Sequence, residues 1–301
     1  MVKNMKKLFN ATFEQSLNLL DDRLVDYMIK DTEKRGLYNG KKRFLLISIS
    51  IILIMAQYGF VKFTELGMKD PDRNSLVPEP DINFLTESFF WIFLFMYLFI
   101  WLYTRYKNKN NSSTRIFITM NTCNNYLIWL ILTVNLFFIT MFLKLLTSIG
   151  MIIVLILLTI VGYIVIRSKC NSLNIKMLNI KDKEKNKVDD FIEKIIQMVL
   201  NYGWIVVIIV IIWNFIFPDG DTPRTDMVGF INILVMWLAF DIGFMIAEAY
   251  LFFPYLLHGY YKHKYSEEYR NFEGKTQLEW YGEKYFNKHI KGTDKEEIYN
   301  E

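Results

Sequence analysis

The chain has 301 residues, of which 52% are hydrophobic and 17% aromatic, and a formal net charge of +4. The apolar residues gather in uninterrupted runs of membrane-spanning length, which excludes an ordinary water-soluble domain. The composition therefore predicts an all-α fold: a polytopic membrane helix bundle. The two cysteines, Cys123 and Cys170, lie in different segments and indicate no disulfide framework.

Residues 1–43 precede the first apolar run and are predicted to form a cytoplasmic amphipathic helix. Apolar residues recur there at steps of three and four, which places them in one helical stripe. This stripe consists of Phe13, Leu17, Leu20, Leu24 and Met28. Thr12 and Gln15 have capping-box spacing, and Gly36 is placed to end the helix. With its ten Lys and Arg residues, the segment suits the membrane surface or docking on the protein's own cytoplasmic face.

Six apolar runs have the length of about 20 residues that a helix needs to cross a bilayer. Their approximate ranges are 44–62, 84–104, 117–143, 147–166, 197–217 and 227–250, within a transmembrane domain of residues 44–260. The amphipathic residues 187–197 are predicted to continue into the fifth span as one long helix. The last apolar run is too long for one span, so a bend near Pro254 is predicted to lay residues 252–261 along the cytoplasmic interface.

The distribution of basic residues predicts the orientation. The N-terminal segment and the loops 105–116 and 167–196 together hold 22 Lys and Arg residues, whereas the loops of the other side hold five. The positive-inside rule then places both termini on the cytoplasmic side of the cell membrane. Residues 261–301 form a cytoplasmic tail that is rich in aromatic residues, so we expect it to fold back on the protein or to hold a partner.

Polar side chains within the predicted spans are the candidate functional residues, because a charge in hydrocarbon is costly and normally faces protein or water. The third, fifth and sixth spans carry such residues in their cytoplasmic halves: Asn121, Asn124, Asn125, Gln197, Asn201, Asp241 and Glu248. Helical spacing places the amides in two stripes. Asp241 and Glu248 lie seven residues apart on one face of the sixth span, which Trp237 and Met245 share.

Two interpretations of these residues remain open. In the first, the stripes converge on a hydrated cavity open to the cytoplasm, where Asp241 and Glu248 bind a cation, a proton or a basic group of a ligand. In the second, the amides join helices by hydrogen bonds, and Glu248 reaches the headgroups. A second polar set lies toward the outer side: Gln57, Glu87, Asn135, Lys144 and Asn214. Glu87 and Lys144 either form a pair near the outer interface or are solvated separately.

The sequence indicates neither a metal site nor a cofactor. Asp219, Asp221 and Asp226 in an outer loop lack EF-hand spacing, so a polar turn is the favoured interpretation. His258 and His263 have no diagnostic metal spacing, and an HExxH motif is absent. Glycine-rich phosphate-binding patterns are absent as well, and nothing points to nucleic acid.

These observations favour a non-enzymatic membrane protein that acts through a protein partner in the membrane or at its cytoplasmic face. Such a protein would be an accessory subunit, a toxin or bacteriocin immunity factor, or a regulator. The alternative is transport, by a permease or a component of an ABC-type exporter that uses the acidic residues of the last span as a coupling site. The sequence leaves the oligomeric state open.

Overall fold

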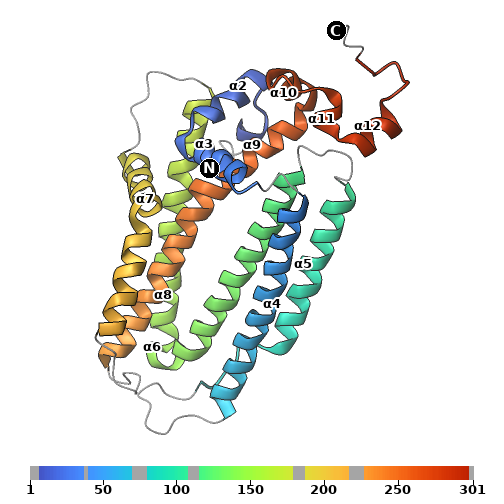
Figure 1. The fold of residues 1–301 in the computed structure, drawn as a ribbon. Helices are drawn as coiled ribbons and strands as arrows, with labels where there is room; N and C mark the ends of the chain where they lie inside the picture. Colours follow the sequence, from blue (N-terminus) through green and yellow to red (C-terminus); the bar gives the residue numbers. More distant parts are fainter. Residues whose placement is uncertain are drawn as a thin grey trace.

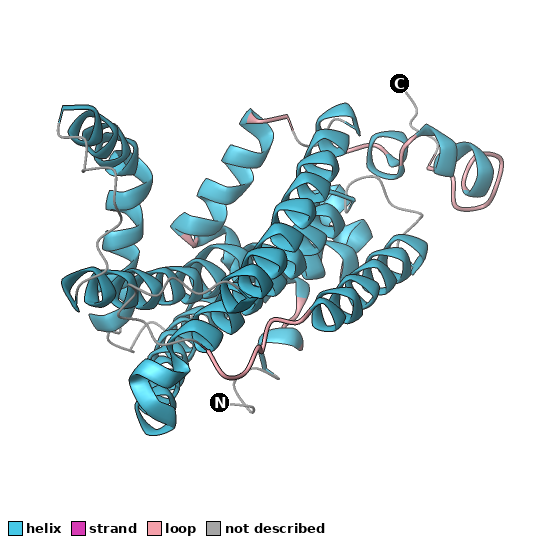
Figure 2. Ribbon diagram, turned by 90° about the horizontal axis from the view of Figure 1, so that it is seen from below, coloured by secondary structure: helices cyan, strands magenta, loops and turns pink. Residues whose placement is uncertain are grey.

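The computed structural model describes residues 7–36, 40–69, 80–107, 115–178, 187–216 and 227–297. Helices and connecting loops make up these ranges, and no strand occurs in them (Figure 2), so the predicted all-α class is confirmed. The long helices lie side by side as a bundle, and the shorter ones gather at one end of it (Figure 1). We call these shorter helices, which come from both ends of the chain, the terminal layer.

The long helices are α4 (Gly40–Lys69), α5 (Glu87–Lys107), α6 (Arg115–Met177), α7 (Lys187–Ile216) and α8 (Met227–Ala247). Among the described residues, three helical segments are long and apolar enough to cross a membrane: Ser50–Lys69, Ile116–Met177 and Met227–Lys264. Glu87–Tyr103 is a shorter apolar helix. As predicted, the amphipathic start of α7 and the apolar run after it form one helix.

Helix α6 has 63 residues and would be about 95 Å long if it were straight. Its backbone instead leaves the helical region at Thr147, where φ is 62° and ψ is 163°. The chain reverses there, so residues 115–146 and 148–177 run as two neighbouring arms, which we call the first and the second arm (Figure 1). The predicted third and fourth spans correspond to these two arms.

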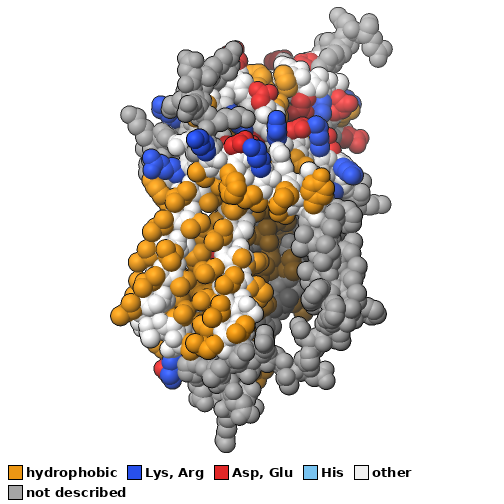
Figure 3. Space-filling view, turned by 90° about the vertical axis from the view of Figure 1, so that its left-hand side faces the viewer, with side chains coloured by type: hydrophobic (Ala, Val, Ile, Leu, Met, Phe, Trp, Pro, Cys, Tyr) orange, Lys and Arg blue, Asp and Glu red, His pale blue; other side chains and the backbone are white. Residues whose placement is uncertain are grey.

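A broad band of hydrophobic side chains covers the described surface of the long helices on the face shown in Figure 3. Charged side chains are concentrated on the terminal layer instead. Large apolar residues are strongly exposed on this bundle: Phe99 on α5 is 71% exposed and Ile149 on α6 is 73% exposed. Exposed apolar surface of this extent is characteristic of contact with lipid or with another protein.

Between Phe13 and Lys34 the N-terminal segment is divided into three elements, so the prediction of a single helix is wrong. These are α2 (Phe13–Leu17), the 3-10 turn η1 (Asn18–Asp21) and α3 (Arg23–Lys34). The break occurs because Asp22 adopts an extended conformation and caps α3, accepting a hydrogen bond of 3.0 Å from the Leu24 amide. The predicted capping box of Thr12 and Gln15 is confirmed, and Gly36 has the positive φ of 63° that ends a helix.

The terminal layer joins the N-terminal segment to the C-terminal helices α9 (Phe253–Lys264), α10 (Ser266–Phe272), α11 (Gln277–Tyr281) and α12 (Glu283–His289). The Ala11 amide donates a hydrogen bond of 3.0 Å to the Tyr261 hydroxyl, and the hydroxyls of Ser16 and Tyr269 are 3.0 Å apart. Leu8, Leu19 and Trp280 are fully buried in the cluster that these segments share with the end of α6. Of the two predicted placements, docking on the protein itself is therefore the one observed.

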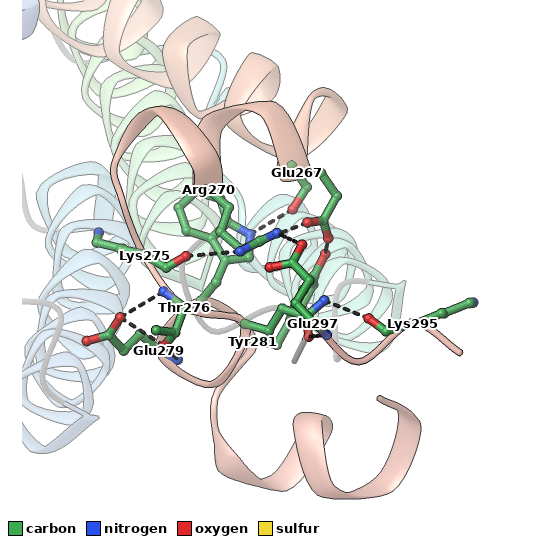
Figure 4. A network of polar contacts seen from close by, with 11 residues as sticks. Glu267, Arg270, Lys275, Thr276, Glu279, Tyr281, Lys295 and Glu297 are labelled. Carbon is green, nitrogen blue, oxygen red and sulfur yellow. Dashed lines mark hydrogen bonds and ion pairs between the residues drawn. The ribbon is translucent and has the colours of Figure 1, made fainter. Parts of the chain in front are cut away.

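The C-terminal segment is held together by a network around Arg270, which is 1% exposed (Figure 4). Its Nε donates to Glu267 at 2.8 Å, and its Nη1 donates to the Lys275 carbonyl at 3.1 Å. Glu297 supplies a second carboxylate. A buried guanidinium is stable only when its donors are paired, so these contacts explain why residues 261–297 fold back.

Contrary to the sequence prediction, the chain around Pro254 does not run along the interface but remains helical and packs inside the protein. Helix α8 continues through a π-helical turn, η2 (Glu248–Phe252), directly into α9. Proline lacks the N–H that an α-helix requires, and the wider turn before Pro254 accommodates this loss. Tyr255, Leu257 and Tyr261 are buried within the protein and do not lie along a membrane interface. Gly259 allows this packing, because a Cβ there would lie 2.8 Å from the Cβ of Phe117.

Candidate functional site

Asp241 is a carboxyl group in the middle of an apolar helix and is only 3% exposed. Placing such a group in hydrocarbon costs free energy, so its surroundings indicate a possible function. Helix α8 presents it to the first arm of α6, where Asn135 Nδ2 donates a hydrogen bond of 2.8 Å to Asp241 Oδ1. The Trp237 Nε1 in turn donates to Asn135 Oδ1 at 3.0 Å. The three side chains therefore form one hydrogen-bonded chain between the two helices.

Packing fixes the orientation of this chain of side chains. The Trp237 indole is 1% exposed and stacks on Phe138, with ring centroids 5.1 Å apart and planes inclined by 20°. Because the indole cannot turn, its N–H holds the Asn135 amide in the orientation that directs Nδ2 at Asp241. Helical spacing correctly predicts that Trp237 shares the face of Asp241, but Asn135 does not belong to a separate outer polar set, as its position in the third span had suggested.

A hollow of about 410 Å³ lies beside Asp241, between the two arms of α6 and α8. It is lined by Ile131, Asn135, Leu155, Leu158, Thr159, Asp241, Phe244 and Met245. Leu155 and Thr159 are exposed, so the hollow reaches the lateral surface of the bundle. An apolar pocket with a few convergent polar groups is the usual form of a ligand site, and here the convergent groups are a carboxyl group and an amide.

Glu248 forms a second polar pair with the first arm. Its side chain lies next to that of Asn124, which is 7% exposed. Within the described part of the chain, Glu248 Oε1 and Asn124 Oδ1 are buried and have no hydrogen-bond partner. Unpaired buried oxygens are rare in proteins and often mark the position of a water molecule, an ion or a ligand. Glu248 is also the first residue of the π turn η2.

The remaining predicted residues lie apart from these two pairs. Asn121 and Asn125 are half-buried on the first arm of α6. Gln197 is half-buried and Asn201 is exposed on α7, a helix whose buried Ile192 and Ile196 belong to the cluster of Val165 in the second arm. The amides of α7 thus do not join the acids of the last helix, which lie against amides of the first arm.

Of the two alternatives for Glu87 and Lys144, a pair between them is not formed. Glu87 instead accepts hydrogen bonds from the Tyr58 hydroxyl at 2.6 Å and from Lys62 Nζ at 2.8 Å, because α4 and α5 are neighbours. Lys144 pairs with Asp81 at 2.8 Å, and both side chains are largely exposed. The loop residues Asp219, Asp221 and Asp226 lie outside the described residues.

A buried ion cluster, which the sequence analysis did not predict, ties the terminal layer to the bundle. It consists of Asp22, Lys169, Lys176 and Glu193. Lys169 Nζ lies 2.9 Å from Asp22 Oδ2, and Lys176 Nζ lies 2.7 Å from the same oxygen. Both lysines are also 3.3 Å from Glu193 Oε1. Burial alone would raise the pKa of Asp22, but the two lysines outweigh it and lower this pKa to about 2.

A sequence signal for this cluster exists. Lys169 and Lys176 are seven residues apart and therefore lie on one helical face, and Glu193 belongs to the predicted amphipathic stretch 187–197. Residues 167–177, however, lie beyond the predicted end of the fourth span, so no helix is expected there. In the structure these residues continue α6.

Comparisons with protein-family models, with curated proteins and with solved structures find no match for this chain. The function is therefore argued from the geometry of the chain itself.

Proposed function

We propose that the chain is an integral protein of the cell membrane with six spans and with both termini on the cytoplasmic side. Three findings support this arrangement. The apolar segment Ile116–Met177 reverses at Thr147 and so has the form of two consecutive spans. The long helices carry an apolar surface band, and on the face shown the charges are concentrated at the end of the bundle that holds both terminal segments (Figure 3).

We further propose that the protein acts by binding a partner in the membrane rather than by catalysing a reaction. The hollow beside Asp241 carries this proposal, because it combines a buried carboxyl group with apolar walls that reach the lateral surface. This geometry suits a membrane-embedded segment that carries a cationic or hydrogen-bond-donating side chain. Such a donor would have a strong interaction with Asp241, since water does not compete in hydrocarbon.

A photo-crosslinking amino acid in place of the exposed Leu155 tests this proposal. In cells, it is expected to capture a specific protein, and the Asp241→Asn substitution should lower the yield at least tenfold, because a hydrogen bond to a charged group contributes about 1.5–3 kcal/mol. Asparagine preserves the volume of the side chain, so the bundle is expected to remain folded. The same crosslinker at Phe99 of α5, which is 71% exposed, is the control.

Two outcomes would contradict partner binding at this hollow. One is an unchanged yield in the Asp241→Asn variant, and the other is capture of the same proteins from position 99. Deletion of residues 262–301 is a poor test of the partner, because Arg270 and Trp280 are buried parts of the terminal layer. Their removal would disrupt that layer itself.

Transport is the second proposed function, and Glu248 is the observation that favours it. Asp241 and Glu248 lie seven residues apart along one continuous helical path, and Glu248 carries a buried oxygen with no partner among the described residues. The two buried carboxyl groups, of Asp241 and Glu248, lie at successive depths along the bundle, which would suit the stepwise passage of a cation or proton. Proton flux into liposomes that contain the wild-type protein, abolished by Asp241→Asn, would favour transport. Absence of flux in the wild type would favour binding alone.

A further inference from the structure

A second hollow, of about 310 Å³, lies where the second arm of α6 meets the start of α7. It is lined by Tyr163, Ile164, Arg167, Ser168, Asn171 and Val188. The hollow is amphipathic. Apolar side chains precede Arg167 along the arm, and polar side chains follow it.

The position of Arg167 along the helix matches a membrane boundary. The stretch 148–166, which precedes it, carries no charge. As a helix this stretch spans about 28 Å, which is close to the hydrocarbon thickness of about 30 Å. Arg167 is therefore the first charged residue of this arm at the level of the lipid headgroups, on the side of the terminal layer. Tyr163 and Ile164, which are 46% and 48% exposed, lie on the hydrocarbon side of it.

The guanidinium of Arg167 is available for an anion. Its contacts in the described part of the chain are to Tyr163, whose hydroxyl lies 3.5 Å from Nη1 and whose ring centroid lies 5.8 Å from Cζ. No described carboxylate forms an ion pair with it. Of the two acids at the start of α7, Asp190 pairs with Lys194 at 2.8 Å, and Asp189 is buried, with 8% exposure.

The chemistry of this hollow fits a phosphate group that is attached to an apolar chain. An arginine side chain presents a planar fork of donors that matches phosphate oxygens. Ser168 and Asn171 line the hollow on the headgroup side of Arg167, and Tyr163 and Ile164 form an apolar wall on its hydrocarbon side. A soluble phosphate would use the guanidinium alone, whereas a lipid would use both parts of the hollow. Basic pockets between helices at this depth are known to bind anionic lipid headgroups.

We propose that this hollow binds the phosphate of an anionic phospholipid, in the membrane leaflet next to the terminal layer. The acyl chains lie along Tyr163 and Ile164, and the headgroup phosphate contacts Arg167. This inference does not depend on Asp241 or on the identity of a partner.

Native mass spectrometry of the full chain, delipidated and then titrated with phosphatidylglycerol, tests the proposal. The wild type is expected to retain phosphatidylglycerol about tenfold more tightly than zwitterionic phosphatidylcholine. Arg167→Ala should remove this preference. The matched control is Lys194→Ala, which removes one positive charge from a side chain that is 73% exposed on the neighbouring helix. Thermal unfolding of the Arg167→Ala variant in detergent without lipid should equal that of the wild type, because Arg167 is exposed.

A competition experiment with inorganic phosphate, at the same concentrations as the lipid, distinguishes a site for a phospholipid headgroup from a site for free phosphate. Phosphatidylglycerol retention that resists an excess of inorganic phosphate supports a lipid site. Displacement of the lipid by stoichiometric inorganic phosphate would overturn the lipid assignment. Equal loss of the preference in the Arg167→Ala and Lys194→Ala variants would overturn the assignment to this hollow.

Discussion

Replacement of Lys169 by methionine is expected to destabilise the docking of the N-terminal segment by about 3 kcal/mol, at the lower end of the range for breaking a buried ion pair. Lys169 is 1% exposed and Asp22 is fully buried. Methionine keeps most of the side-chain volume beside Tyr250, whose ring centroid lies 4.9 Å from Lys169 Nζ. The substitution therefore removes the charge and leaves Asp22 with one cationic partner, Lys176.

Native-state proteolysis measures this effect, because cleavage within helices requires local opening. Trypsin should cleave the N-terminal segment of the Lys169→Met variant about 100-fold faster than that of the wild type. The control is Lys194→Met, which breaks an exposed pair and should leave the cleavage rate nearly unchanged. Equal cleavage of the two variants would show that the buried ion cluster does not hold the segment.

The same cluster has a pH signature. The pKa of Asp22 is about 2 in the folded protein, below its ordinary value of about 3.9 in an unfolded chain. A lowered pKa means that the carboxylate contributes stability above pH ~3.9 and that this contribution is lost as the pH falls toward 2. Pepsin cleavage of the wild type should therefore increase over this window more steeply than cleavage of an Asp22→Asn variant.

Replacement of Trp280 by alanine is expected to destabilise the C-terminal part of the terminal layer by about 3–5 kcal/mol, the usual cost of removing a buried tryptophan. Trp280 is fully buried, and its Nε1 donates a hydrogen bond of 2.8 Å to Ser266 Oγ. Lys262 Nζ lies 5.1 Å from the ring centroid. One side chain thus connects α9, α10 and α11.

Hydrogen exchange gives the measurement. Amides of α10 and α11 should exchange on the order of 100-fold faster in the Trp280→Ala variant, whereas amides in the buried part of α8 should change little. Leu278→Ala is the matched control, because Leu278 lies on the same helix and is 46% exposed. Unchanged exchange in α11 of the Trp280→Ala variant would mean that the layer is not a cooperative unit.

Both polar pairs in the bundle could be predicted from how far each residue lies along its helix from the same end of the bundle. Asn135 precedes the reversal at Thr147 by nearly the same stretch of helix that separates Asp241 from Met227, where α8 begins. Asn124 lies farther from Thr147, and Glu248 lies farther from Met227, again by nearly equal numbers of residues. Because the first arm and α8 are antiparallel, residues at equal distances from these two positions face each other, and both pairs are predicted. A division of the membrane into only two depths separates Asn135 from Asp241 and so hides the first pair.

Other features could not be predicted from periodicity. The stripe in the N-terminal segment is consistent with one helix, yet Asp22 interrupts that helix: one carboxylate oxygen caps α3, and the other is held by Lys169 and Lys176 of α6. Those partners belong to a distant part of the chain, so no local pattern reports them. Pro254 is a local signal for a bend, but the π turn before it and the burial of α9 against α6 keep the helical path continuous.

The proposals for both hollows require that the bundle spans the membrane, and the central claim is that it does so with both termini on the cytoplasmic side. One labelling experiment tests this orientation most directly. Cys170 is 3% exposed and unsuited to labelling, so Cys123 and Cys170 are first replaced by serine, and single cysteines are introduced at the exposed positions Glu14, Ile82 and Phe272. In intact cells, a thiol reagent that cannot cross membranes should label position 82 alone. Positions 14 and 272 should react only after permeabilisation. Labelling of position 14 or 272 in intact cells would contradict the arrangement of six spans with both termini inside.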